Sequence, residues 1–230
     1  MNPVDDLIEA YRDEVNVATS SFYTWKSIND LAAANDEILR TLNANALVWN
    51  IIAHSLQVTF FVALGRIFDR NQKSLTALSF IEKCRAEIGQ FSKSALEARR
   101  LKDARGARPE WLDGYLAAMY EPAESDFDAL AQATQSYEAT YRARYQPIRH
   151  KVIAHKDLAT IGSKDALFKN TNIGEVENML QYLKQVEQVV EQWYLNGRNT
   201  NLADHSLDKP LRVHEELARI FRELSVAKDI

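Results

Sequence analysis

Apolar residues recur every three or four positions along most of the chain, which is the spacing of one face of an α-helix. This series predicts a long first helix over residues 4–34. Comparable series predict further helices over about 43–68, 74–91, 125–148, 175–194 and 210–226. Seven glycines and five prolines in 230 residues leave few breaks, and no strand pattern stands out. The sequence therefore predicts an all-α protein.

Individual polar residues and one proline predict where these helices begin, bend or end. Asn43, Ser74 and Ser125 have the side chains that cap helix N-termini. Pro147 lacks a backbone donor and is expected to kink the chain. Asn196-Gly197 is a typical helix stop.

The helix over 43–68 is apolar on most sides, which predicts a place in the middle of a helical bundle. Because Asn50, His54 and Gln57 interrupt its apolar stretch, we interpret it as a buried helix rather than a membrane span. His54 then belongs to a hydrogen-bonded polar cluster in the core, or else supports a nearby site or a dimer groove.

The elements fit one domain, residues 1–230, built on an antiparallel four-helix bundle. We expect the bundle core over about 45–195, with extra helices at 4–34 and 210–226. Residues 92–125 contain a run of basic residues, and glycine and proline interrupt the helical spacing there. We interpret this segment as an insertion packed on the bundle.

Composition narrows the cellular setting. The single cysteine, Cys84, lies on an apolar face and is expected to be a core residue, consistent with a reducing cytoplasm. The first residues are acidic, unlike a secretory signal, so we expect a cytoplasmic protein without membrane contact. The net charge is −4, so a nucleic-acid ligand would need locally concentrated basic residues.

Such a concentration occurs once beside two histidines. Residues 149–157 read Arg-His-Lys-Val-Ile-Ala-His-Lys-Asp. This stretch resembles the Arg-polar-(several)-His signature of the HEPN superfamily, with His150 in the polar place and five residues between Arg149 and His155. Residues 61–69, ending Gly-Arg-Ile-Phe-Asp, are similar to the end of the second helix in the AbiU-type branch. That branch is associated with abortive infection and toxin–antitoxin loci.

The resemblance, over about residues 45–195, implies metal-independent RNA cleavage by paired motifs in a homodimer. Arg149 would stabilise the charge on the phosphorane, because a guanidinium keeps its charge and binds phosphate with two donors. His155 would act as general acid or base, since its pKa lies near neutrality, and His150 would position phosphate or assist. In a straight helix Arg149 and His155 lie about 120° apart, so we expect a bend or a second protomer to complete the site.

Further residues are candidates for supporting roles. Arg66 and Asp69 are three apart and form either a structural ion pair or part of the site. Lys151, Lys156 and Asp157 flank the histidines. Some HEPN toxins are silenced when a partner enzyme modifies a tyrosine two places after the histidine. Asp157 stands in that place here, so this mode of silencing is not expected. Two basic clusters are candidates for RNA contact: Arg142 and Arg144, and Arg99, Arg100 and Lys102. Each cluster is alternatively a solvated surface.

Three functions are compatible with a helical bundle that carries this signature. The first is a HEPN-type endoribonuclease acting as toxin or antiphage effector, with RNA as substrate, a homodimeric state and a possible antitoxin or defence-system partner. The second is a HEPN-like module that binds RNA or protein without catalysis. The third, a di-iron bundle enzyme, is disfavoured because no histidine has a glutamate three places before it. We therefore expect no metal and no cofactor.

Overall fold

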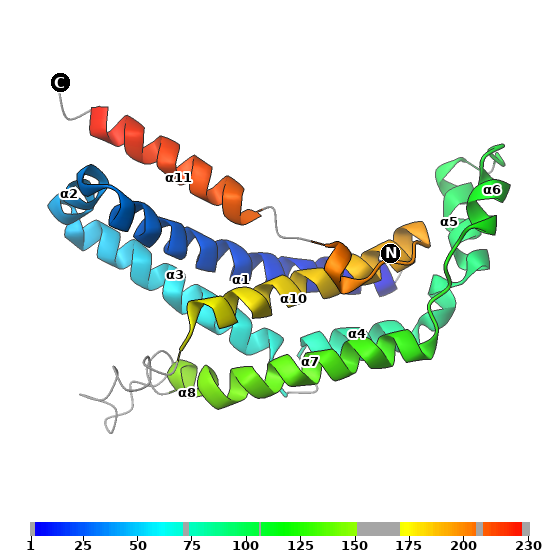
Figure 1. Ribbon diagram of the computed structural model, residues 1–230. Helices are drawn as coiled ribbons and strands as arrows, with labels where there is room; N and C mark the ends of the chain where they lie inside the picture. The colour runs from blue at the N-terminus through cyan, green and yellow to red at the C-terminus, as the bar shows by residue number, and fades with distance from the viewer. Residues whose placement is uncertain (1–2, 71–73, 106, 151–170, 206–208, 227–230) are drawn as a thin grey trace.

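The structure, a computed structural model, describes residues 3–70, 74–105, 107–150, 171–205 and 209–226. Within these ranges every regular element is a helix and none is a strand (Figure 1). The predicted all-α class is confirmed.

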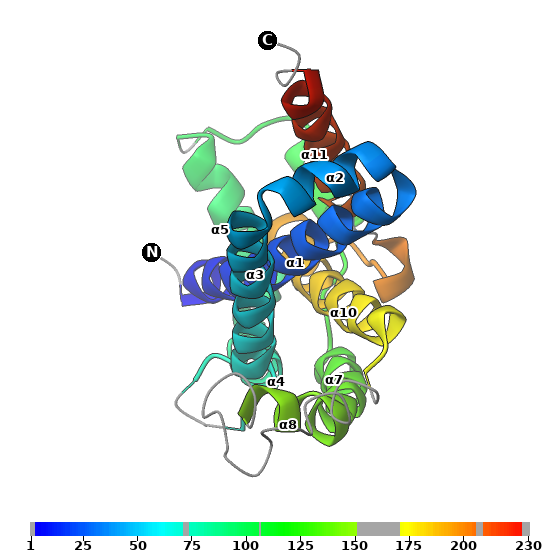
Figure 2. The same ribbon diagram turned by 90° about the vertical axis from the view of Figure 1, so that its left-hand side faces the viewer.

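Helix α1 (Pro3–Ala34) is the central element of the bundle. Its buried side chains follow the three-four spacing of the sequence, and they include Val4, Ile8, Tyr11, Val15 and Phe22. The helix packs against α3 (Ala46–Ile67), α10 (Ile173–Glu191) and α11 (Lys209–Val226), and it lies between α3 and α10 in Figure 2. The first helix thus belongs to the core, where the sequence had suggested a flanking position.

A short helix that the sequence analysis missed joins α1 to α3. Helix α2 (Asp36–Ala44) begins after Asn35, whose side chain accepts hydrogen bonds from the backbone N–H groups of Glu37 and Ile38. Asn43, the predicted cap, lies inside α2, and the chain breaks at Asn45. The predicted cap of the helix over 43–68 was wrong, because Asn43 still belongs to α2 and α3 begins only after Asn45, whose side chain donates to the Thr41 carbonyl instead of capping α3.

Helix α3 has two different halves. Its C-terminal half is in the core, with Phe60, Phe61, Leu64 and Ile67 buried. Its N-terminal half has one face on α1 and α11 and an opposite face in solvent, with Leu47 77% exposed. The predicted burial in the middle of the bundle was therefore wrong for this half, since no helix among the described residues covers its outer side.

The next part of the chain adds helix α4 to the bundle and then forms an arm at one end of it. Helix α4 (Ala77–Ala86) is capped by Thr76 rather than by the predicted Ser74, because the Thr76 hydroxyl accepts from the Ser79 N–H. Helices α5 (Lys93–Asp103) and α6 (Leu112–Ala117) then pack on each other around a small separate cluster, consisting of Leu96, Leu112 and Leu116. The predicted insertion is this arm.

Helix α7 (Glu124–Arg144) returns along the bundle to α8 (Gln146–Ile148). The predicted cap at Ser125 was wrong: Ser125 lies in the first turn, and the Asp126 carboxylate instead accepts from the Ala123 N–H. At the other end of the fold, α10 runs into a π-helical turn and stops at Gly197, which has φ of 53°. The predicted stop at Asn196-Gly197 is confirmed.

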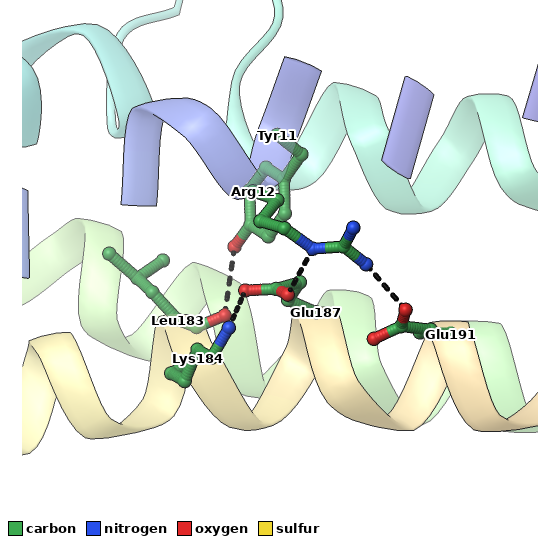
Figure 3. Close-up of polar contacts among 6 residues, drawn as sticks. All are labelled: Tyr11, Arg12, Leu183, Lys184, Glu187 and Glu191. Atoms are coloured by element: carbon green, nitrogen blue, oxygen red, sulfur yellow. Dashed lines mark hydrogen bonds and ion pairs between the residues drawn. The ribbon is translucent and has the colours of Figure 1, made fainter. Parts of the chain in front are cut away.

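A buried ionic network joins α1 to α10 (Figure 3). The Glu187 carboxylate, 1% exposed, accepts from Arg12 at 2.8 Å and from Lys184 at 2.6 Å. Arg12 also pairs with Glu191 at 2.6 Å. The Tyr11 hydroxyl donates to the Leu183 carbonyl. The first and last helices of the core are therefore held together by polar as well as apolar contacts.

Candidate functional site

A break between α7 and α8 positions the start of the HEPN-like signature. The helix ends at Arg144, Tyr145 forms a turn, and Pro147 lies in the first turn of α8. The Tyr145 ring is buried, and its hydroxyl lies 2.8 Å from Glu175 Oε2 and 3.2 Å from the Asn172 N–H nitrogen at the start of α10. The predicted bend near Pro147 is confirmed, and it directs Arg149 away from the line of α7.

The Arg149 side chain lies across the C-terminal half of α3. Its guanidinium passes directly over Gly65, so closely that a methyl group at residue 65 would come within 2.6 Å of Nε and Nη1. The side chain is half-buried in this position, whereas the next residue, His150, is exposed. Arg149 is thus held at the junction of α3, α7 and α8.

Tyr141 forms the other side of this junction. It is 1% exposed, and its ring stacks on Phe68 with centroids 5.3 Å apart. Burial raises the pKa of Tyr141 to about 12, while Arg149 opposes this rise and Asp69 adds to it. The guanidinium, the phenol and the Asp69 carboxylate are therefore electrostatic neighbours.

Arg66 and Asp69 do not use each other as principal partners. Arg66 pairs with Glu14 of α1 at 2.6 Å, and the Asp69 carboxylate accepts from the Arg70 backbone N–H at 2.7 Å. The ion pair that the sequence offered as one explanation is thus replaced by a link from α3 to α1. Asp69 remains an electrostatic neighbour of Tyr141.

The arginines before the signature are already paired. Arg142 lies 3.8 Å from Glu138, and Arg144 lies 2.7 Å from Glu175. For Arg149, by contrast, no carboxylate in the described parts of the chain lies within ion-pair distance. Among the described residues, Arg149 is therefore a half-buried guanidinium of this junction without a carboxylate partner.

The second half of the signature cannot be placed beside these groups. Lys151, His155, Lys156 and Asp157 lie outside the described residues. What the structure brings together is thus Arg149 with Gly65 and Tyr141, and Tyr141 in turn with Asp69.

The family is shown by a match over nearly the whole chain. The family model HEPN_AbiU2, described as AbiU2, matches residues 1–221. The chain belongs to the AbiU2 family of HEPN proteins. The match extends beyond the residues 45–195 on which the sequence resemblance rested, and it includes α1 and most of α11. No curated protein and no solved structure matches the chain.

The second basic cluster of this AbiU2-family protein lies far from the signature. Helices α5 and α8 stand at opposite ends of α7 (Figure 1), whose 21 residues span about 30 Å. The two clusters therefore do not line one cleft. Arg99 donates to the Gln90 and Tyr194 carbonyls and lies over the Tyr194 ring, and Arg100 donates to the Leu195 carbonyl. These two side chains hold the arm onto the end of α10, whereas Lys102 is exposed.

A groove that the sequence did not predict begins next to Asp69. It has a volume of about 670 Å³ and runs between α4 and α7. Its charged lining residues carry both signs: Asp69, Arg70, Glu82, Lys83 and Glu138. Glu138, 7% exposed, pairs with Arg70 at 2.6 Å across one end. Sequence reasoning also missed Gly65 and Tyr141, although a glycine inside an apolar helix is a signal of close approach.

Proposed function

We propose that this protein is a metal-independent endoribonuclease of the HEPN type that acts as a toxin or antiphage effector. The observation that carries the proposal is the state of Arg149: a half-buried guanidinium, held over Gly65, without a carboxylate partner among the described residues. A guanidinium in this state suits phosphate, which it binds with two parallel donors. Membership of the AbiU2 family supports a role in abortive infection.

The proposed reaction needs a base, an acid and a stabilising cation. The base takes the proton of a ribose 2′-hydroxyl, and the 2′-oxygen attacks the adjacent phosphorus. The bond from phosphorus to the 5′-oxygen breaks, and the acid protonates that oxygen. The products are a 2′,3′-cyclic phosphate and a 5′-hydroxyl. Arg149 stabilises the charge on the phosphorane, His155 transfers protons, and His150 positions phosphate or assists.

The supporting groups follow from their positions in the sequence and the fold. Lys151 and Lys156 supply positive charge next to the histidines, which offsets the net charge of −4. Asp69 lies near Tyr141, the buried neighbour of Arg149, and adds negative charge on that side of the junction. We place the protein in the cytoplasm and assign it a possible antitoxin or defence-system partner.

We further propose a homodimer in which the uncovered face of α3 packs against a second copy. Leu47, Val48 and Ile51 are 77%, 56% and 58% exposed, and residues 41–65 contain no aspartate, glutamate, lysine or arginine. A large apolar face without charge is typical of an interface between subunits. The same helix continues to Gly65, so the two copies of the Arg149 site come together when the two α3 helices of this dimer run parallel, and we propose that orientation.

The dimer is tested by placing charge on this face. Leu47→Glu with Ile51→Glu should convert a dimeric mass into a monomeric one and reduce RNA cleavage, whereas Leu211→Glu, a control residue 66% exposed on α11, should change neither. Helix α3 is also, within the described ranges, long and apolar enough to cross a membrane by length and composition alone. A wild-type monomer that sediments with lipid vesicles would therefore overturn the dimer in favour of a membrane surface.

The catalytic proposal is tested at Arg149. Arg149→Ala should abolish cleavage of single-stranded RNA, and Arg149→Lys should restore little of it, because lysine keeps the charge without the two parallel donors. Circular dichroism and thermal melting check that both variants fold. If purified wild-type protein binds RNA without cutting it, the non-catalytic binding module replaces this proposal.

A further inference from the structure

Gly65 occupies an unusual place for a glycine. It lies within the buried C-terminal half of α3. Its backbone there is ordinary right-handed helix, a conformation that every residue type can adopt. Glycine is among the least favourable residues in a helix interior, so local structure gives no reason for it here. The reason is the side chain above it: Arg149 Cδ, Nε and Nη1 occupy the space that a Cβ atom would fill.

We propose that Gly65 is a positioning residue that sets the place of the Arg149 guanidinium. The missing side chain lets the arginine lie directly on the α3 backbone, with buried Tyr141 as its neighbour. The arginine enters this position from a fixed backbone, since the Arg149 N–H donates to the Tyr145 carbonyl at 3.1 Å. Contacts on two sides thus restrict a side chain that otherwise has many rotamers.

The consequence for function rests on the proposed cleavage of RNA. A methyl group at residue 65 would displace the guanidinium without removing its charge. Affinity for RNA depends mainly on charge, whereas stabilisation of the phosphorane depends on where the donors lie. Gly65 therefore influences the chemical step more than binding.

The test compares two glycine-to-alanine variants. Gly65→Ala should lower kcat on a labelled single-stranded RNA of mixed sequence by about 100-fold, with KM changed by no more than about threefold. Gly114→Ala is the matched control, because it also lies in a helix but has nothing within 4 Å of the added methyl group. Equal kcat values for both variants and the wild type would overturn the proposal.

A second measurement separates the placement from the catalysis. The Nε–H signal of Arg149 in NMR, assigned by its loss in Arg149→Lys, should move in Gly65→Ala and stay in Gly114→Ala. In addition, Gly65→Ala should lower the melting temperature of the wild type, because of the clash with Arg149, and raise that of Arg149→Ala, where the clash is absent. An unmoved signal together with equal melting shifts would refute the placement, even if RNA cleavage itself is established. Conversely, the NMR shift and the unequal melting shifts could both be observed in a protein that does not cut RNA. That result would refute the proposed function and leave the placement of Arg149 by Gly65 intact.

Discussion

The buried carboxylate of Glu187 allows the cohesion of the bundle to be tested by a one-atom change. Glu187→Gln keeps the shape of the side chain but removes the charge that Arg12 and Lys184 share (Figure 3). The amide has one acceptor oxygen, so its nitrogen must face one of the two cations. Glu191→Gln is the matched control, because Glu191 pairs with the same arginine but is 26% exposed.

The expected magnitudes follow from burial. A hydrogen bond to a charged group contributes about 1.5–3 kcal/mol, and a neutral one about 1 kcal/mol. Glu187 is 1% exposed, but Arg12 is 33% and Lys184 is 19% exposed, so solvent screens part of the interaction. We therefore expect Glu187→Gln to lower the free energy of unfolding by about 2 kcal/mol. Glu191→Gln should lower it by about 0.5 kcal/mol, as for an ordinary surface pair.

Urea denaturation, followed by tryptophan fluorescence and circular dichroism together, measures both values. Coincident curves from the two probes justify a two-state treatment in a chain of this size. On heating, a loss of 2 kcal/mol corresponds to a lower melting temperature by about 4–8 °C. Equal losses for Glu187→Gln and Glu191→Gln would refute the argument, because burial would then have no influence on the strength of the pair.

Three further predictions concern burial elsewhere in the fold. Cys84 is fully buried and burial raises its pKa to about 12, so a thiol reagent should modify it only after unfolding; rapid modification of the native protein would contradict this. Burial raises the folded-state pKa values of Tyr141 and Tyr182 from 10.0 to about 12. Their contribution to stability is therefore complete below pH 10 and is lost as the pH rises towards 12. Melting temperatures that show no such loss between pH 10 and pH 12 would contradict this. Arg99→Ala should cost about 2 kcal/mol of stability because its guanidinium bonds two carbonyls, whereas Lys102→Ala should cost less than about 0.5 kcal/mol; matching urea midpoints would count against the structural role of Arg99.

Periodicity alone predicted most of the helical elements, because burial on one face leaves a three-four spacing in the sequence. The long first helix and the stop at Gly197 were predicted in this way. The helix starts were less certain, since several polar residues compete to cap each one. Thr76 caps α4 although Ser74 stands two residues earlier, because only Thr76 forms the reciprocal bonds with Ser79.

The environment of a helix face is harder to predict than the helix itself. An apolar stretch such as residues 47–64 has the same sequence signature whether it is buried within one chain or between two chains. Of the two roles that the sequence left open for His54, the core polar cluster is wrong, because the structure places this residue in solvent. Arg149 was identified from its motif, but its contact with Gly65 joins residues far apart in the chain, and spacing carries no information on it.

Metal-independent cleavage of RNA by Arg149 and His155 would be recognised by the chemical nature of the cut ends. Purified protein is incubated with single-stranded RNA in excess chelator, beside Arg149→Ala and His155→Ala controls that melt at the wild-type temperature. We expect the wild type to leave 2′,3′-cyclic phosphate and 5′-hydroxyl ends and both variants to leave the RNA intact. Undiminished cleavage by the two variants, or intact RNA with the wild type, would contradict it.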